Sequence, residues 1–321
     1  MRTAVILVTF NNWELTKNCL TDLAQQIADQ EHFVIAVIDN ASTDGTVEKI
    51  QKKFPTIHLY PCDENLGFGT ANNLAIDWLI RDGEIFDSIC LLNNDTRLEP
   101  DTLPRLQNAW VNAKTLTHTN NHAYAIVAPV IKNKDGSEQP NYFAGLGPDK
   151  IGTLRFLTNA FRNEKSAAAI LQGNLSKTGQ PNLLETYWFS GVCWMFGKDL
   201  YEALLKKDGF FDEKIFMYYE DGDLALRARK LGARFFICSD IPLTHLGGGS
   251  AQNSLSRALQ HDRAQQYVFT KHFGIKGLLL SKIFRILRSF VRIVSVIPCI
   301  GNPEKRKYLL HHLSLLKAAL W

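Results

Sequence analysis

The 321-residue chain lacks the features of a disulfide-linked or cysteine-bound zinc protein. Its six cysteines lie far apart, and no two of them form a CxxC pair. This spacing argues against a zinc site and a disulfide framework, and it predicts buried, reduced thiols. The chain also has no internal repeat, no low-complexity segment and no run of about 20 uninterrupted apolar residues, the length that a membrane-spanning helix needs.

The N-terminal residues lack the small-residue cleavage site of a secretory signal. The run MRTAVILVTF is apolar but short, so we expect it to form a first strand of a cytoplasmic protein. The composition is ordinary for a globular protein, with 45% hydrophobic and 21% charged residues. A chain of this length can bury a large core, either as one α/β domain or as a domain with an appendage.

Positive charge is concentrated at the C-terminal end of the chain. From Lys276 onward there are nine basic residues and one acidic residue, a net charge of +8, against +4 for the whole chain. Residues 1–275 therefore carry about −4. A nucleic-acid-binding protein more often spreads basic residues over its folded face, so we expect no nucleic-acid partner.

The first 130 residues alternate between strand-like and helix-like patterns. Apolar runs at 3–9, 33–38, 57–60 and 88–92 are separated by helical patterns near 13–27, 44–53, 70–81 and 101–112. Such alternation predicts an α/β fold with right-handed crossovers and a mostly parallel central sheet with flanking helices. Residues 124–131 predict a fifth strand.

The pattern changes after residue 132. Residues 133–186 are rich in Gly, Asn, Ser and Lys and are typical of an insertion or mobile loop, with one helix near 163–172. Residues 187–196 (YWFSGVCWMF) resume as a strand, and helices near 198–206 and 221–231 precede another strand, ARFFIC.

Acidic residues follow several of the strand-like runs directly. Asp39, Asp95 and Asp221 each come just after an apolar stretch, and His245 follows another. In an open α/β sheet the ligand binds outside the carboxyl ends of the strands. Carboxylates at that edge can hold a nucleotide and a divalent cation, and one of them can act as a base. The arrangement indicates an active site.

The candidate nucleotide-binding residues lie in three segments. They are Thr9, Phe10 and Asn11 in VTFNN, Asp39 in IDNASTDGT, and Asn65, Gly67 and Asn72 in ENLGFGTANN. A charged Asp39 oxygen can accept a hydrogen bond from a base N–H, whereas Asn11 and Asn72 can equally cap a helix. The G-x-G-x-x-N run is a weak dinucleotide fingerprint, because it lacks the third Gly and follows the third strand.

The candidate metal ligands are Asp95 and His245. A cation bound to a nucleotide diphosphate keeps several positions for phosphate and water, so one or two protein carboxylates suffice. Asn94 beside Asp95 is a further candidate contact to the nucleotide-sugar. Asp95 can instead cap a helix, and a lone His is more often structural.

The segment YYEDGD places Glu220, Asp221 and Asp223 at the start of a helix. The helix dipole alone favours acidic residues there, and Asp223 can pair with Arg227 four residues on. A carboxylate facing an acceptor hydroxyl is nevertheless what sugar transfer with inversion requires, because it takes the hydroxyl proton.

These motifs, in this order, resemble those of the family 2 glycosyltransferases, most of all the bacterial rhamnosyltransferase-type branch. The resemblance extends over residues 1–272 and rests on the motifs above together with WFSGVCWMF, GFFDEKIFMYYEDGDLALR and LTHLGGGS. It implies a GT-A fold, with Asp39 at the nucleotide base, Asp95 and His245 on Mg²⁺ or Mn²⁺, Asp221 as catalytic base, and Trp188, Gly191 and Glu220 at the acceptor.

The resemblance implies an inverting transferase that moves one sugar, from dTDP-rhamnose or a UDP-hexose, to a lipid-linked glycan in cell-surface polysaccharide synthesis. The QxxRW signature of processive relatives is missing, and Asn93-Asn94-Asp95 has one acid where many relatives have two. The alternatives are a sugar-nucleotide pyrophosphorylase, which needs a basic Gly-rich loop that VTFNNWELT lacks, and a non-catalytic glycan-binding member.

Residues 273–321 form a separate tail in this interpretation, made of basic amphipathic helices. Lys282, Arg285, Arg288 and Arg292 recur at helical spacing and are expected on one face, opposite Ile283, Phe284, Ile286, Leu287 and Phe290. Such a helix suits an anionic membrane surface. We therefore expect residues 276–321 to hold the protein peripherally at the inner face of the cell membrane; the alternative is a helix docked on the core.

Overall fold

The computed structural model describes residues 1–26, 32–119, 122–139, 141–143, 176–178, 180, 182–247, 254–296 and 303–320. The chain forms two compact units. The first comprises Met1–Phe143, Asn174–Phe216 and Glu220–Gly249, and the second comprises Ala144–Gly173, Met217–Tyr219 and Ser250–Trp321. The helix expected near 163–172 lies outside the described residues.

The first unit begins with the predicted alternation of strands and helices. The strands are β1 (Thr3–Thr9), β2 (Phe33–Asp39), β3 (His58–Pro61) and β4 (Ser88–Asn93), and the helices are α1 (Trp13–Gln26), α2 (Thr46–Lys53), α3 (Phe68–Arg81) and α4 (Thr102–Thr119). All three pairings among these strands are parallel. Crossover helices cover both faces of such a sheet, which explains why β1 and β2 are apolar along almost their whole length.

The remaining strands complete a mixed sheet. They are β6 (Tyr124–Lys132), β8 (Ser176–Lys177), β9 (Leu183–Thr186), β11 (Cys193–Gly197) and β12 (Ala233–His245), in the order β3-β2-β1-β4-β11-β6-β12-β9-β8, with β5 (Thr96–Leu98) paired to β12. Strand β11 is antiparallel to both β4 and β6. The sheet is therefore parallel in its N-terminal half and mixed beyond β4.

The single strand expected over residues 187–196 is two strands in the structure. Residues Trp188–Phe189 form β10, which pairs with β7 (Tyr142–Phe143) in a small second sheet, and β11 begins only at Cys193. The turn between them is closed by Trp194, whose indole Nε1 donates to the Ser190 carbonyl at 2.8 Å. An apolar run conceals such a turn, because both strands and the turn's Val192 are buried.

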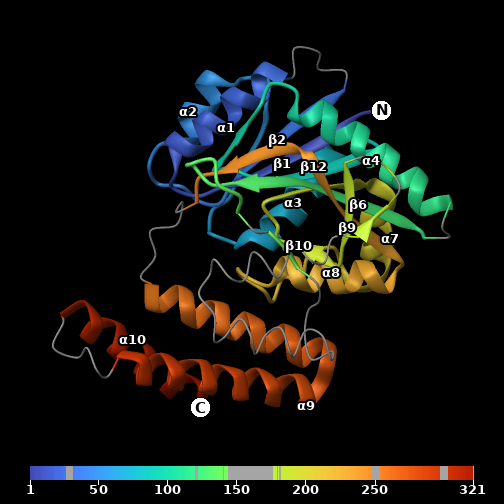
Figure 1. Cartoon of the computed structure of the whole chain (residues 1–321). Helices are drawn as coiled ribbons and strands as arrows, with labels where there is room; N and C mark the ends of the chain where they lie inside the picture. Colours follow the sequence, from blue (N-terminus) through green and yellow to red (C-terminus); the bar gives the residue numbers. More distant parts are fainter. Residues whose placement is uncertain are drawn as a thin grey trace. The chain divides into compact units, whose positions relative to one another are not determined.

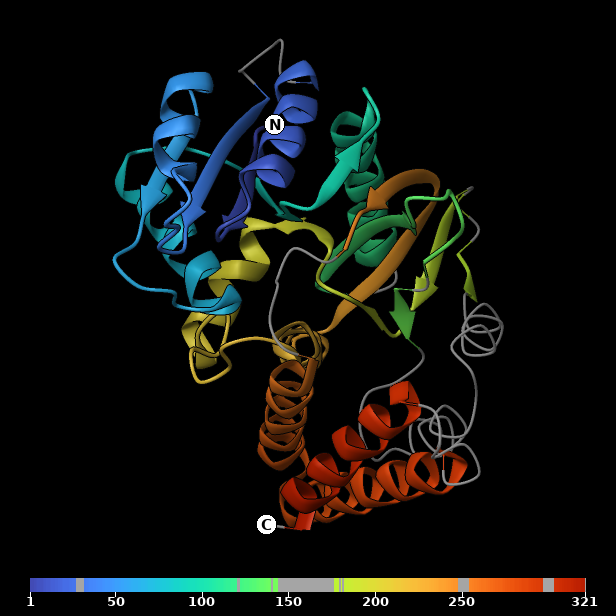
Figure 2. The same cartoon turned by 90° about the vertical axis from the view of Figure 1, so that its left-hand side faces the viewer.

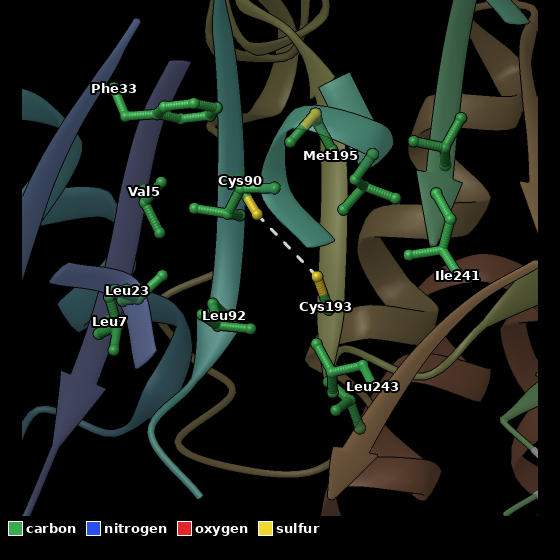
Figure 3. Close-up of a cluster of buried hydrophobic side chains, with 14 of the residues drawn as sticks. Val5, Leu7, Leu23, Phe33, Cys90, Leu92, Cys193, Met195, Ile241 and Leu243 are labelled. Carbon is green, nitrogen blue, oxygen red and sulfur yellow. Dashed lines mark hydrogen bonds between the residues drawn. The ribbon is translucent and has the colours of Figure 1, made fainter. Parts of the chain in front are cut away.

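Helices lie on both faces of the large sheet (Figure 1). Helices α1, α2 and α4 cover one face, and α3, α7 (Lys198–Asp208) and α8 (Glu220–Lys230) cover the other. The core on the first face includes Val5, Leu7 and Leu92 from the sheet, packed with Leu23 of α1 (Figure 3).

Buried thiols contribute to this core. Cys19, Cys90, Cys193 and Cys238 are free and buried, and the Sγ atoms of Cys90 and Cys193 lie 3.9 Å apart (Figure 3). Burial raises the pKa of Cys19 to about 12, so this thiol stays protonated. The prediction of buried, reduced cysteines is confirmed for these four; Cys62 is partly exposed, and Cys299 lies outside the described residues.

The second unit contains two long helical segments, α9 (Ser254–Val296) and α10 (Pro303–Leu320), which run side by side (Figure 2). Helix α9 is broken at Gly274, where φ is 60° and ψ is −148°. Its two halves touch, since a Cβ on Gly277 would lie 2.2 Å from the Phe269 carbonyl oxygen. No described helix is both long enough and apolar enough to cross a membrane.

Arg285, one of the basic residues expected to face an anionic membrane surface, is buried in the structure. This side chain is 5% exposed; its Nε lies 3.2 Å from Asp262 Oδ2, and its Nη1 donates to Gln266 Oε1 at 3.0 Å. Helical spacing alone does not reveal that Asp262, 23 residues earlier, folds back as a buried partner. The C-terminal stretch of the second unit is Ser250–Trp321.

We predict that Gly67→Ala strongly destabilises the first unit. Gly67 has φ 78° and ψ −178°, and a Cβ there would lie 2.1 Å from the carbonyl oxygen of Phe216, which accepts the Phe68 N–H at 3.0 Å. Strain and overlap together should lower the free energy of unfolding by at least about 3 kcal/mol. Urea denaturation of the two proteins measures this.

Gly83→Ala is the matched control, because Gly83 also has a positive φ, 83°, but a Cβ added there would meet nothing within 4 Å. Its cost should be about 1 kcal/mol, the backbone strain alone. Equal losses in the two variants would show that contact with Phe216 does not matter.

Candidate active site

The predicted site residues gather at one edge of the large sheet. Thr9 is paired with Asp39 at the ends of β1 and β2, and Val8 is paired with Asn93 at the end of β4. Strand β11 enters at this edge, since the Asn93 N–H donates to the Val192 carbonyl at 3.0 Å. Strand β12 is parallel to β6 and ends at His245 on the same side. Strand direction therefore brings together residues from all parts of the first unit.

Asp39 is a buried carboxylate with one oxygen unused among the described residues. It is 1% exposed; Oδ1 accepts from the Ser42 N–H at 2.7 Å, and Oδ2 has no hydrogen-bond partner. Burial raises the pKa of Asp39 above its ordinary value, against the lowering effect of Ser42. A buried oxygen without a partner is costly unless a ligand supplies a donor. This arrangement suits a base N–H.

The loop after β1 is locked to the loop after β2. Asn11, with φ 49°, accepts the Thr43 N–H on its Oδ1 at 2.7 Å, and its own N–H donates to Ser42 Oγ at 2.8 Å. Thr9 is buried, and its hydroxyl lies 2.7 Å from that of Thr16. Thr9 and Asn11 thus shape the edge around Asp39, while Phe10 between them is 43% exposed.

Asn40, a residue for which the sequence predicted no role, holds the loop before α3. Its Nδ2 donates to the Gly67 carbonyl at 3.0 Å, and its Oδ1 accepts the Leu66 N–H at 3.0 Å. Asn65 closes the same loop by accepting the Gly67 N–H at 3.0 Å. The only sequence signal for Asn40 is its position directly after Asp39.

Asn72 is buried within α3. Its side chain is 1% exposed and donates to the Phe68 carbonyl at 2.8 Å, inside its own helix. This bond gives Asn72 a structural role, and its assignment to nucleotide binding stays a prediction. Asn94 also makes internal bonds, from Nδ2 to Thr16 Oγ1 at 2.9 Å and to Thr9 Oγ1 at 3.2 Å.

Asp95 and His245, the two candidate metal ligands, lie together. His245 pairs with Thr96 across β12 and β5, and its Nε2 is 3.2 Å from Asp95 Oδ1. On the other side of the ring, Nδ1 donates to Gln139 Oε1 at 3.0 Å, because an amide oxygen can only accept. This bond fixes the ring so that Nε2 faces Asp95.

This pair fits a six-coordinate cation. Two acceptor atoms at 3.2 Å repel each other unless a proton or a cation lies near both. Neighbouring ligands of an octahedral ion with bonds of about 2.1 Å are about 3 Å apart, close to the observed separation. Among the described residues no group of three or more His, Cys, Asp and Glu side chains is placed to hold a metal. Asp95 and His245 are therefore two candidate ligands among the described residues.

An ion pair between a buried aspartate and an exposed arginine, which no sequence pattern predicted, fixes the strand that follows Asp95. Asp22 of α1 is 7% exposed and accepts from Arg97 Nε at 2.6 Å, from Arg97 Nη2 at 2.9 Å and from the Leu98 N–H at 3.0 Å. This bidentate pair holds β5 against α1. Local motifs do not indicate it, because the partners are 75 residues apart.

Asp221 is held by two backbone amides at the start of α8. Its Oδ2 accepts the Gly191 N–H at 2.9 Å, and its Oδ1 accepts the Gly222 N–H at 2.7 Å. A Cβ on Gly191 would lie 3.4 Å from the Asp221 Cβ, so a side chain there would crowd this contact. Gly191 therefore acts through Asp221. The nearby Asp223 is structural: it is fully buried and pairs with Arg227 Nε at 2.8 Å.

Glu220 carries a second carboxyl group beside Asp221. Its Oε2 is buried and has no hydrogen-bond partner among the described residues. Burial, and then the charge of Asp221, raise the pKa of Glu220 to about 8. Glu220 therefore carries a proton at neutral pH, whereas Asp221 is held by N–H donors that suit an ionised carboxylate.

Trp188, which is predicted to contact the acceptor, is buried in the structure. It is 7% exposed, and its ring stacks on Phe143 at 4.3 Å with an interplanar angle of 23°. The pairing of β10 with β7 explains this position, since it places the two aromatic residues opposite each other.

Comparison with known proteins identifies the family. Residues 4–170, just over half of the chain, match the model of glycosyl transferase family 2. The chain is a family 2 glycosyltransferase. The transferase is 27% identical over 315 residues to an N-acetylglucosaminyl-diphospho-decaprenol L-rhamnosyltransferase of Mycobacterium tuberculosis, covering 90% of this chain and 94% of that protein. It is 24% identical to the dTDP-rhamnosyl transferase RfbF of Shigella flexneri, covering 76% and 68%. It thus lies in the rhamnosyltransferase-like branch.

Solved structures show the same fold. The transferase matches S. aureus TarS 1-349 in complex with UDP-GlcNAc with a TM-score of 0.52 and 17% identity, over 99% of this chain and 82% of that one. It matches the mannosyltransferase PcManGT of Pyrobaculum calidifontis, in complex with GDP-Man and Mn²⁺, with a TM-score of 0.51 and 14% identity, over 99% and 86%. The predicted GT-A fold of the transferase is confirmed.

We predict that Glu220→Gln makes the stability of the transferase less dependent on pH. The folded-state pKa of about 8 lies above the ordinary value of 4.5, so between these values the folded protein holds a proton that the unfolded chain releases. Stability therefore falls as the pH rises through this window. At pH about 8.5 the variant should have a higher melting temperature than the wild type. At pH about 4.5 the two melting temperatures should be equal.

The exposed Glu213 supplies the control, since Glu213→Gln should change neither melting curve. Parallel pH profiles for wild type and Glu220→Gln would mean that Glu220 is ionised in the folded protein at neutral pH.

Proposed function

We propose that this transferase moves a single sugar from a nucleotide-diphospho-sugar to a hydroxyl of a lipid-linked glycan, with inversion at the anomeric carbon. One observation carries the proposal. The Asp221 carboxylate, fixed by the Gly191 and Gly222 amides, belongs to the same sheet edge as Asp39 and the Asp95–His245 pair. A base, a nucleotide contact and a cation site are the three parts that such a transfer needs.

Asp221 acts as the base in this proposal. It takes the proton of the acceptor hydroxyl as that oxygen forms a bond to the anomeric carbon. The bond from this carbon to the diphosphate oxygen breaks, and its electron pair leaves with the nucleoside diphosphate. Glu220, protonated beside it, adds no second negative charge, so Asp221 remains the carboxylate that receives the proton.

The donor is proposed to bind along the ends of β1, β2 and β4. Asp39 Oδ2 accepts a base N–H, and the loops held by Asn11, Asn40 and Asn65 enclose the nucleoside. Rhamnose from dTDP-rhamnose is the favoured sugar, because two relatives are named as rhamnosyltransferases. A hexose from a UDP-sugar is the alternative.

Asp95 and His245 are proposed to hold Mg²⁺ or Mn²⁺. The bound cation would neutralise the diphosphate charge of the donor and of the departing nucleoside diphosphate. Gln139 fixes the His245 ring, and the Asp22–Arg97 pair fixes the strand after Asp95. These three residues are positioning residues.

A lipid-linked acceptor is proposed from the decaprenol-linked substrate in the name of the mycobacterial relative. It places the protein peripherally at the inner face of the cell membrane, with residues 276–321 towards anionic lipid. Because the chain belongs to the family 2 glycosyltransferases, we reject the pyrophosphorylase alternative. A non-catalytic member would keep the fold but release no nucleoside diphosphate from any donor.

We predict that Asp221→Asn lowers turnover by about 10²–10⁴-fold and leaves donor binding nearly unchanged, because it keeps the shape but removes the basic oxygen. Release of nucleoside diphosphate from a panel of nucleotide sugars measures turnover. Calorimetric titration with the nucleoside diphosphate measures binding.

Asp39→Asn is the matched control, with the opposite pattern: weaker donor binding and a smaller effect on the turnover of saturated enzyme. If Asp221→Asn kept more than about a tenth of wild-type turnover, the base assignment would be wrong.

We also predict that EDTA abolishes turnover and that added Mn²⁺ or Mg²⁺ restores it, since a cation held by Asp95 and His245, the two candidate ligands among the described residues, would exchange readily. Asp95→Asn should require a higher Mn²⁺ concentration for half-maximal activity, and its affinity for Mn²⁺ in the presence of nucleoside diphosphate should fall about tenfold or more. Full activity in a metal-free preparation would contradict the cation site.

A further inference from the structure

The second half of helix α9 buries several polar residues and exposes a stripe of apolar residues. Its buried face carries Gly277, Ser281, Arg285 and Ser289, spaced by four residues. Its exposed face carries an outer stripe, consisting of Ile275 (65% exposed), Leu279 (53%), Ile283 (49%), Leu287 (39%), Phe290 (58%) and Val294 (46%). The intervals of four, four, four, three and four residues place these six side chains along one side of a helix.

This arrangement is the reverse of that of a helix on a water-soluble protein. Such a helix turns its apolar stripe towards the core and its charges towards water. Here Arg285 is buried beside Asp262 and Gln266, so the inward face of this half of α9 carries a charged side chain. The outer stripe runs from residue 275 to residue 294, about 28 Å of helix. Contiguous exposed apolar surface of this size marks an interaction site.

We propose that the outer stripe enters the apolar boundary of an anionic lipid bilayer, with this half of α9 lying parallel to the membrane surface. The inference rests on the proposed function, because a lipid-linked acceptor brings the enzyme to a bilayer. It also specifies how the enzyme binds: apolar side chains insert, and the basic residues add attraction at the surface.

Charge supports lipid as the occupant of this face. Nine basic residues and one acidic residue follow Ile275, and Lys276 is exposed next to the start of the outer stripe. Basic residues beside an exposed apolar stripe are typical of helices that bind in the interface of anionic membranes. A second copy of the chain would bring the same excess of positive charge into contact with itself.

Vesicle flotation of the full-length protein tests the proposal. The vesicles are of phosphatidylcholine with phosphatidylglycerol, or of phosphatidylcholine alone. A triple variant, Leu279→Ser, Ile283→Ser and Phe290→Ser, should lose about tenfold in partitioning for each side chain. A matched triple variant replaces exposed apolar residues of the first unit, Ile85→Ser, Val111→Ser and Leu205→Ser, and should bind vesicles like the wild type.

Salt separates insertion from purely electrostatic binding. In about 1 M NaCl the Debye length falls to about 3 Å, so an electrostatic contact should be lost while part of the insertion remains. A Phe290→Trp variant adds a direct measurement: its emission should shift to shorter wavelength when anionic vesicles are added. This single exposed change reports insertion even if the triple variant folds poorly.

Two results would overturn the inference. One is wild-type vesicle binding by a folded triple variant, with no emission shift for Phe290→Trp. The other is a wild-type dimer that the triple variant converts to monomer, with no lipid binding by either, because the outer stripe would then join two copies. Donor turnover by the wild type without vesicles tests the proposed function separately, so the two failures are distinguishable.

Discussion

The parallel pairing of β1 with β2 and β4 is the constraint on which the site depends. Parallel strands all end at the same edge, so a residue that follows one strand necessarily lies near residues that follow the others. Asp39, Thr9 and Asn93 are neighbours for this reason alone. The antiparallel β11 then enters at that edge, and it brings Gly191 to Asp221. The apolar strands therefore determine where the polar site residues lie, at and beyond the strand ends.

Buried carboxylates in this protein fall into two groups. Asp22, Asp223 and Asp262 are each neutralised by an arginine. The pairs of Asp22 and Asp262 join segments that are far apart in the sequence, whereas Asp223 and its arginine lie on adjacent turns of α8. Asp39 and Glu220 each keep a buried oxygen without a partner among the described residues. The first group stabilises structure, because truncating one partner would leave a buried charge. The second group lies where we place the ligands, and unmet hydrogen-bonding capacity there is consistent with binding or proton transfer.

In the second unit, too, an arginine neutralises a buried aspartate, but the helix that carries this arginine exposes its apolar residues. The Arg285–Asp262 contact lets α9 bury a polar face, and this leaves its apolar residues outside. This ion pair therefore lies on the buried side of the helix, opposite the outer stripe. The sequence pattern was amphipathic in either case, so periodicity alone gives the two faces but not which one is exposed.

The sequence by itself determined the strand–helix alternation, the family and the residues at strand ends, because these depend on local periodicity and on short motifs. The closeness of Asp95 and His245 followed from strand direction, although 150 residues separate them. Only the tertiary structure decided the positions of Trp188 and Asn72, the partners Asn40, Gln139 and Arg97, and the burial of Arg285. These depend on contacts between segments far apart in the chain, which no local pattern of apolar and polar residues specifies.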